Sequence, residues 1–351
     1  MTRRTIGFSF ILIFLSNSNV VGAPRSIDTS RIGFVPSATV VDSPAICRGT
    51  HNVGNMVLPV GNDGTFGARY GGRYGYQDCF TGETRYTGCE FPKGSGTDYL
   101  YRGAFWIGAL VYRDTLVSVG AEGWDPGGEL FPDVSPQGKI IYRSITDPTS
   151  PRYLGAVSEQ DYIAKYFDTC LSCPGMLPDR IDFRSHRPLH IEVTQRSYAW
   201  SYSYAQNFVL FDYTIRNIGL RKLSKVYMGI HVDSDVNSPP DDIVGFRRAL
   251  PASYSPGAKC TYEDSLTMAW VADNDGDSDI VSSVTATRIV RTPTDDAEIS
   301  FNWWAGGWGL KNDFGPQRKD KYRSFGTEGD GFPSSDRNKY WVLRNKEIDY
   351  D

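Results

Sequence analysis

Basic clusters, long apolar runs and histidines are all scarce in this 351-residue chain, and each scarcity excludes a class of function. Basic residues form no block and the net charge is −4. A nucleic-acid partner is therefore disfavoured, because phosphate binding needs a clustered basic face. After residue 23, no apolar run approaches the roughly 20 residues of a membrane-spanning helix. Charged residues make up 22% of the chain, which is unlike a disordered acidic chain or a coiled coil.

Signatures of catalysis are missing as well. The chain has four histidines and no GxSxG motif, which disfavours a nucleophilic hydrolase even though His231 precedes Asp233. His186 and His190 form HxxxH, but Pro188 opposes the helix that would align them. On a strand they would lie about 13 Å apart, which is too far for one zinc ion. The 41 acidic residues include no motif that marks a glycosidase pair. No catalytic residue is nominated, and an enzyme is the less favoured reading.

The first 23 residues have the composition of a secretory signal. Arg3 and Arg4 precede an apolar run from residue 6 to 15, and small residues follow at 20–23. Pro24 disfavours cleavage directly after Ala23, so we expect cleavage after Gly22 or slightly earlier. Removing this segment changes the net charge to about −6, with no membrane span remaining.

Aromatic residues and turn formers are abundant. Tyr and Phe number 21 and 18, which favours strands, and 36 Gly and 20 Pro punctuate them. Apolar residues alternate in four segments, at 189–195, 208–219, 225–232 and 265–272, with a further strand at 138–145. Residues 103–120 read as a hairpin parted by Arg113-Asp114. The strands recur with turns between them, which predicts a mostly β fold, an antiparallel β-sandwich, with one short helix.

The helix is predicted at residues 158–168. Ser158 can cap it, Asp161 follows three residues later, and Tyr162, Ile163 and Tyr166 share a helical face with Phe167.

Domain organisation follows from the same survey. Residues 1–23 are the expected signal and residues 24–60, rich in Pro and Ser, are expected to be irregular. Residues 61–351 are expected to form one large sandwich, with a possible boundary near 174–186.

The cysteines number six, and an even count in an exported chain suggests disulfides. Six cysteines allow 15 pairings, and the sequence does not choose among them. Spacing makes a bond between Cys79 and Cys89 plausible. Cys170 and Cys173 form a CxxC after the predicted helix, which favours a local staple or a structural site over redox chemistry. Cys47 and Cys260 complete the set.

Several longer stretches carry a resemblance. They include "GNDGTFG", "CEFPKGSGTDYLYRGAFWIGALV", "DTLVSVGAEGW", "VYMGIHVDSDV", "WVADNDGD" and "NKYWVLRNKEIDYD". Through them most of residues 50–351 resembles a group of uncharacterised exported bacterial proteins that have no established activity. Relatives in this group often continue into further β-domains and a C-terminal type IX secretion sorting segment, which this sequence lacks. The resemblance implies a β-rich exported protein and a chain truncated at its C-terminus.

Two acidic stretches are candidate metal sites. "DNDGDSD" places Asp273, Asp275, Asp277 and Asp279 at alternate positions around Gly276. Alternating carboxylates on a tight glycine loop aim several oxygens at one centre, which predicts calcium in preference to zinc. The stretch is similar to the calcium loops of thrombospondin type-3 and dockerin repeats. It has no Glu at the closing position of a helix-loop-helix site.

The second acidic stretch is "DSDVN", with Asp233, Asp235 and Asn237. We expect both stretches to end strands of one sheet and to form one calcium site. The alternative is that each is a solvated acidic turn.

A tryptophan group, "FNWWAGGWG", contains Trp303, Trp304 and Trp308. Exposed tryptophans stack on sugar rings, so these residues are candidate ligand-binding residues, although core packing is the commoner role.

The sequence thus predicts a secreted or bacterial cell-surface β-sandwich protein of structural, adhesive or binding type, stabilised by calcium. Surface glycans or other cell-envelope proteins are the possible partners. The alternatives are a carbohydrate-binding module or part of a secreted glycan-degrading hydrolase, and a secreted hydrolase of another type.

Overall fold

The structure of the chain is a computed structural model. The structure describes residues 5–16, 45–68, 72–121, 127–134, 136–179, 183–238, 242–247, 250–251, 262–263, 267–276, 280–294, 297–304, 333 and 335–348.

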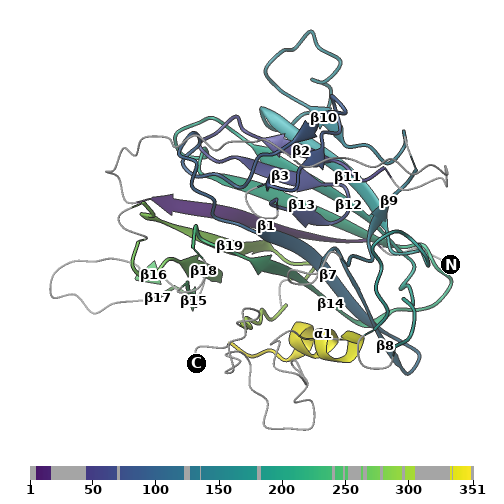
Figure 1. Ribbon diagram of the computed structural model, residues 1–351. Coiled ribbons are helices and arrows are strands. Elements are labelled where there is room, and N and C mark those ends of the chain that lie inside the picture. The colour runs from purple at the N-terminus through teal and green to yellow at the C-terminus, as the bar shows by residue number, and fades with distance from the viewer. Residues whose placement is uncertain are drawn as a thin grey trace.

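The larger of two main sheets has nine strands, and all its pairings are antiparallel. In spatial order its strands are β10 (Ile141–Arg143), β11 (Gln160–Phe167), β12 (Ile191–Ala199), β13 (Phe208–Asn217), β1 (Thr5–Ser16), β19 (Ser283–Arg291), β18 (Met268–Ala272) and β15 (Ile243–Arg247), while β9 (Phe131–Pro132) pairs with β11. Figure 1 shows this sheet running across the molecule, with β1 in purple at its centre.

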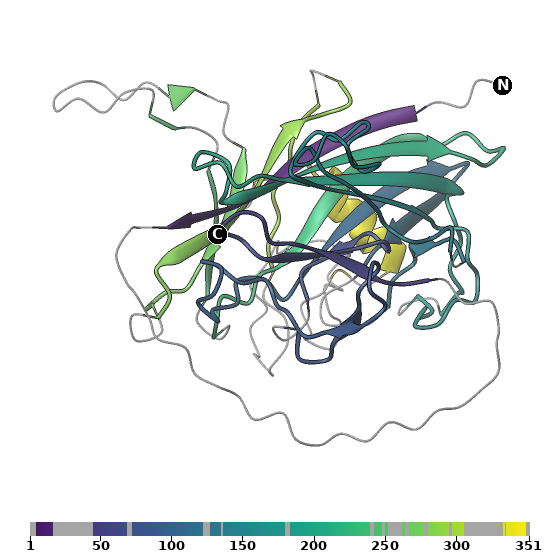
Figure 2. The ribbon, with the colours of Figure 1, turned by 90° about the horizontal axis from the view of Figure 1, so that it is seen from above.

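The second sheet has six strands, again antiparallel. Its order is β14 (Ser224–Asp233), β7 (Arg102–Val111), β4 (Thr65–Phe66), β3 (Leu58–Gly61) and β2 (Arg48–His51), while β8 (Asp114–Val119) pairs with β7. Two small hairpins join β5 (Tyr76–Gln77) to β6 (Thr84–Arg85) and β16 (Leu250–Pro251) to β17 (Tyr262–Glu263). Figure 2 shows the two main sheets as layers, which confirms the predicted mostly β, sandwich-like fold.

The core lies between these layers. Strand β12 alternates buried and half-buried residues along its whole length, as a strand with one covered face does. The two sheets meet through aromatic pairs, in which Phe105 of β7 stacks on Tyr213 of β13 with ring centroids 4.8 Å apart. Phe66 of β4 contacts Phe211 of β13 at 5.2 Å. These contacts lock one face of β13 against the second sheet.

The predicted hairpin at 103–120 is confirmed as β7 and β8, which pair from Val111↔Asp114 to Trp106↔Val119. The predicted helix at 158–168 is wrong, because those residues form strand β11 between β10 and β12. Tyr162 and Tyr166 are buried together with Ala164, so the burial period is two rather than 3.6.

The helix of the described residues is α1 (Ser335–Arg344) instead. Figure 1 shows α1 in yellow beside β8 and β14. The Tyr340 hydroxyl donates to the Lys225 carbonyl at 2.8 Å, and the Tyr340 ring packs edge-on against Tyr227. Residues from α1 thus cover the outer face of the six-stranded sheet, where Trp106 and Val119 also lie.

Three further expectations can be compared with the described residues: the irregular segment, the signal and the domain boundary. Strand β2 and all but the last residue of β3 lie within residues 24–60, a segment expected to be irregular. The expected signal contains strand β1, paired on both sides within the large sheet. One buried cluster runs from Cys47 to Val281 and includes residues from both sides of the possible boundary at 174–186.

Candidate functional site

The two acidic stretches end strands of different sheets. Asp233 is the last residue of β14 in the six-stranded sheet, and Asp273 directly follows β18 in the nine-stranded sheet. The expectation that both end strands of one sheet is therefore wrong. Alternation of apolar residues predicts a strand but does not say which sheet that strand joins.

Asp242 nevertheless brings the two stretches together. Ile243 of β15 pairs with Ala272 of β18, so Asp242 and Asp273 are the next residues on these antiparallel strands and lie side by side. The Asp242 carboxylate also accepts a hydrogen bond from the Val236 amide at 3.0 Å, inside the "DSDVN" stretch. One carboxylate thus connects the two predicted metal segments.

Asp98 adds a carboxylate that the sequence analysis did not single out. Its backbone carbonyl accepts from the Asn237 amide at 2.9 Å, and its side chain accepts from the Cys89 amide at 2.7 Å. The pKa of Asp98 is raised to about 7, chiefly by burial and also by the negative charge of Asp235, against backbone hydrogen bonds that lower it. No motif around "GTDYL" marks this residue, because only the tertiary fold places it beside Asp235.

The "DSDVN" aspartates share this environment. The pKa of Asp233 is raised to about 7 by burial and by the charge of Asp235, while Arg102 opposes this rise. Arg102 is the register partner of Asp233 on β7. Burial raises the pKa of Asp235 to about 6. Asp98, Asp233 and Asp235, called here the aspartate cluster, thus lie in poorly solvated surroundings that favour their protonated forms.

The "DNDGDSD" loop has the tight turn that the sequence predicts. The Asp273 carboxylate accepts from the Asp275 amide at 3.0 Å and from the Gly276 amide. Gly276 has a φ of 78°, a left-handed conformation that favours glycine, and its carbonyl accepts from the Val281 amide at 3.0 Å. The negative charge of Asp273 also helps burial to raise the pKa of Tyr99, so this loop lies near the residue that follows Asp98.

Asp277 and Asp279 lie outside the described residues. Among the residues that the structure does describe, no three His, Cys, Asp or Glu side chains are grouped closely enough to hold a metal ion. Calcium therefore stays a prediction. The oxygen-only donors and the raised pKa values of the aspartate cluster suit a hard cation, which would favour the charged carboxylates.

Trp304 belongs to a ring stack beside this cluster. Trp106 and His231 are stacked with centroids 5.2 Å apart, and Trp304 covers His231 at 5.5 Å. Burial lowers the pKa of His231 to about 3, so its ring is neutral. Trp303 and Trp304 are half-buried, while Trp308 lies outside the described residues. Trp304 thus has a packing role and still keeps part of its surface accessible.

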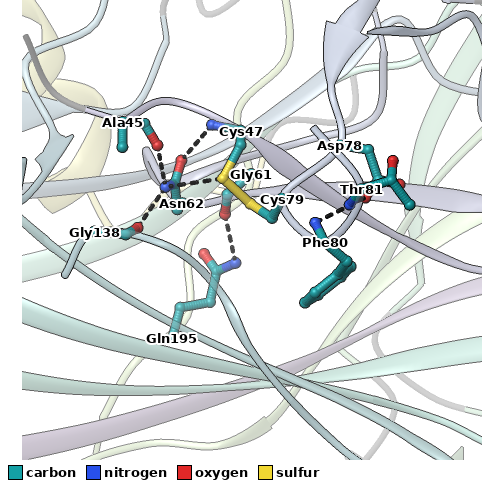
Figure 3. Close-up of a disulfide and its surroundings, with 10 residues drawn as sticks. All are labelled: Ala45, Cys47, Gly61, Asn62, Asp78, Cys79, Phe80, Thr81, Gly138 and Gln195. Atoms are coloured by element: carbon teal, nitrogen blue, oxygen red, sulfur yellow. Dashed lines mark hydrogen bonds between the residues drawn. A yellow bond between two sulfur atoms is a disulfide. The ribbon is translucent and has the colours of Figure 1, made fainter. Parts of the chain in front are cut away.

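The disulfide Cys47–Cys79 joins the start of β2 to the turn between β5 and β6, with the Cα atoms 5.0 Å apart (Figure 3). The suggested Cys79–Cys89 bond is wrong. The Cys79 amide donates to the Arg48 carbonyl at 3.0 Å, which holds Cys79 against the residue after Cys47. Cys89 is a buried free cysteine, and burial raises the pKa of its thiol.

Asn62 organises the surroundings of this disulfide (Figure 3). Its side chain accepts from the Cys47 amide at 3.0 Å and donates to the Ala45 carbonyl at 2.8 Å and the Gly138 carbonyl at 2.6 Å. Cys170 and Cys173 form the second disulfide, a local staple, and Cys260 lies outside the described residues.

A buried ion pair between His186 and Glu129 has no motif in the sequence that marks it. His186 Nδ1 lies 3.0 Å from a Glu129 oxygen, and its Nε2 lies 2.8 Å from the Asp168 carbonyl. Both partners are acceptors, so both ring nitrogens carry protons. Burial opposes this charge, but the Glu129 carboxylate raises the pKa of His186 above its ordinary value. His190 takes no part in these contacts, so HxxxH does not act as a unit.

Arg184 contacts Asp336 of α1 at 2.5 Å, and these two residues line a pocket together with Glu129, His186 and Lys339. Among the described residues, no helix is long and apolar enough to cross a membrane.

No protein-family model, curated protein or solved structure matches this chain.

Proposed function

We propose that the protein is an exported or cell-surface β-sandwich protein of structural, adhesive or binding type, and that calcium holds its acidic loops. The observation that carries this proposal is that Asp98, Asp233 and Asp235 of the aspartate cluster all have raised pKa values, and that the charge of Asp235 acts on the other two. A cation bound near these carboxyls would offset the repulsion from Asp235 and would favour their charged forms. Calcium suits such a site because it takes six to eight oxygen ligands with flexible geometry.

The "DNDGDSD" loop would contribute further oxygens to the same cation or to a second one close by. Asp273 lies beside Asp242, and Asp242 is hydrogen-bonded to the "DSDVN" stretch. Asp275 is exposed at the turn, where a carboxylate is available to a cation from solvent. Calcium bound here would join loops from both sheets, which would resist their separation.

Export is supported by the cysteines and by the leader-like N-terminus. The Cys47–Cys79 bond and the Cys170–Cys173 staple suit an oxidising compartment outside the cytosol. Extracellular environments also supply calcium at concentrations that fill sites with dissociation constants of about 10⁻⁴ to 10⁻³ M.

A carbohydrate-binding role is the second candidate, and one observation favours it. Trp304 lies on His231, and His231 shares a face of β14 with Asp233, two residues further along. A partly accessible indole ring that stacks on the strand face carrying a carboxyl group is a combination that can hold a sugar by stacking and hydrogen bonding. In this second candidate function the ligand is a surface glycan. Binding of the parent and of Trp304→Ala to a glycan array tests it, and the variant should lose binding.

The calcium proposal is tested by thermal unfolding. The melting temperature is measured with calcium, with magnesium and with chelator for the parent, Asp235→Asn and Asp275→Asn. At a calcium concentration ten times the dissociation constant, binding to the folded state alone adds about 1.4 kcal/mol. We expect calcium to raise the melting temperature of the parent and most of that gain to vanish in both variants.

The matched control is Asp147→Asn. Asp147 accepts from the Thr149 amide at 2.9 Å in an exposed turn built like that of Asp273, so it tests the loss of one turn carboxylate away from the cluster. This control should keep the full calcium gain. Identical melting temperatures of the parent in calcium and in chelator would rule out the calcium part of the proposal.

A further inference from the structure

Strand β1 occupies an unusual place in the large sheet. It pairs with β13 from Thr5↔Arg216 to Ile13↔Phe208 and with β19 from Ser9↔Arg291 to Ser16↔Ser283, antiparallel to both. Strands β13 and β19 therefore run parallel to each other on its two sides. Figure 1 shows the N-terminal strand between them, in the middle of the sheet rather than at an edge.

The same residues lie in the segment that is expected to be removed on export. Without them, the sheet has two facing strand edges with unpaired N–H and C=O groups near its middle. Direct closure of β13 onto β19 would create a parallel pair, whereas every strand pair among the described residues of this sheet is antiparallel. Closure would also move two half-sheets together by about 5 Å, the spacing of one strand. The flanking strands are thus arranged for a third strand between them.

We propose that this slot is a strand-addition site, and that in the exported protein it takes an extended segment from a separate polypeptide chain. The inference rests on the proposed function, because it requires that the N-terminal segment is removed on export. Strand addition gives affinity through backbone hydrogen bonds and specificity through alternate side chains. Here both edges of the added strand would be paired, rather than one.

The slot specifies the chemistry of its occupant on the core side. Four alternate residues of β13 are each 0–3% exposed, namely Val209, Phe211, Tyr213 and Ile215. Directly opposite positions on neighbouring strands share a face, so the occupant needs apolar residues at four alternate positions. The N-terminal segment has Leu12, Phe10, Phe8 and Ile6 at these register positions.

The outer side adds a size limit. Asp212 and Arg291 are both register partners of Ser9, one on each flanking strand. Their side chains form an ion pair of 2.7 Å and so meet across the backbone of the strand between them. The occupant therefore needs a small residue at this position. The partner segment is an extended strand as long as the 12 residues of β1, apolar at four alternate positions, with a small residue at the position of Ser9.

The experiment starts from the full chain, with a protease site inserted between residues 17 and 23. The protein is folded intact, its melting temperature is compared with that of the parent, and the linker is then cut. The probe is a labelled peptide with the sequence of residues 4–17 and three added lysines for solubility. We expect the peptide to displace the cut strand, to remain bound through gel filtration at one peptide per protein, and to keep the amides of β13 and β19 protected from hydrogen exchange.

Two altered peptides test the specificity. A peptide with the changes Phe8→Ser and Phe10→Ser removes the apolar core positions and should fail to displace the strand. A peptide with Ser9→Trp should bind at least tenfold more weakly, and Arg291→Ala in the protein should restore part of its binding. Equal binding of all three peptides would contradict the inference, since it would mean non-specific association.

The register gives a second measurement. A peptide with cysteine at the position of Gly7 should form a disulfide with Thr214→Cys in the cut protein, because Gly7 and Thr214 are register partners. A peptide with cysteine at the position of Phe8 should not. Cross-linking of both peptides alike, or of neither, would overturn the proposed slot.

Three other outcomes also overturn the inference. If the cut strand leaves while β13 and β19 stay protected and bind no peptide, the sheet closes by itself. If the cut protein dimerises and excludes the peptide, the slot belongs to a second copy of this chain. If native exported protein retains residues 5–16, this chain fills its own slot and the leader hypothesis fails as well. An N-terminus beyond residue 16 combined with failed peptide binding rejects the slot and leaves the proposed function standing.

Discussion

Asp233→Asn should stabilise the calcium-free protein at neutral pH and have little effect in acid. The pKa of Asp233 is raised from 3.8 to about 7 by burial and by the charge of Asp235. Between these two pH values the folded protein keeps a proton that the unfolded chain releases. The stability contributed by this proton is fully present below pH 4 and is lost as the pH rises through about 7.

The size of the stability change follows from the rise in the pKa of Asp233. A rise of roughly three pH units corresponds to about 4 kcal/mol at 1.36 kcal/mol per unit. That value is a ceiling for Asp233, because Asp98 and Asp235 titrate together with it and redistribute the protons. We expect about half of it, so Asp233→Asn should raise the free energy of unfolding by about 2 kcal/mol at pH 7.5 in chelator. At pH 4 the parent carboxyl is itself neutral, and the difference should be close to zero.

The assay is urea unfolding of the parent and the variant at pH 4, 5.5 and 7.5 in chelator, repeated at pH 7.5 with calcium. Calcium should reverse the order at pH 7.5, since the parent gains a bound cation and the variant loses a ligand. Asp147→Asn is the control, because hydrogen bonds from Thr149 lower the pKa of this exposed carboxyl and so give no stabilisation on its removal. A variant that is less stable than the parent in chelator at pH 7.5, or a difference that does not change with pH, would refute the reasoning.

Three further predictions concern the disulfide, the core and the buried ion pair. Replacing Cys47 and Cys79 together by Ser should lower the free energy of unfolding by about 3–4 kcal/mol, because their bond closes a loop of 32 residues; an unchanged urea midpoint would mean that the bond is absent. Phe211→Ala should cost about 3–5 kcal/mol, since the ring is fully buried between the sheets, and a loss under 1 kcal/mol would place it outside the core. His186→Gln should cost about 3–5 kcal/mol by leaving Glu129 buried without its charged partner. Because the pKa of His186 is raised, this loss should be largest below pH 6.5 and shrink as the pH rises through its folded value, and a loss that grows with pH would contradict the assigned charge.

Much of the β architecture follows from the sequence alone. In 208–219 the apolar residues alternate, and strand β13 buries that same alternate set. The hairpin at 103–120 is marked by two apolar runs around Arg113-Asp114, and β7 and β8 pair around that turn. Alternation and turn residues are enough to identify these strands. A strand with one buried face has apolar residues at every second position, and this spacing can be seen in the sequence.

The tertiary structure decided what local pattern leaves ambiguous. Residues 158–168 have apolar side chains at both helical and strand spacing, and pairing with β10 and β12 selects the strand. Helix α1 has a weak pattern of its own and is stabilised by packing on β7, β8 and β14. Cys79 pairs with Cys47, 32 positions away, because the sheet holds the two backbones together, whereas sequence spacing points to Cys89.

The same division holds for the candidate site. The sequence identifies the two acidic stretches from their composition and glycine, and the tight turn at Gly276 has the left-handed backbone that this pattern predicts. Asp98 and Asp242 join those stretches through contacts between segments far apart in the chain. Such contacts depend on how the sheets stack. The pattern of residues along the chain does not determine which distant segments this stacking brings into contact.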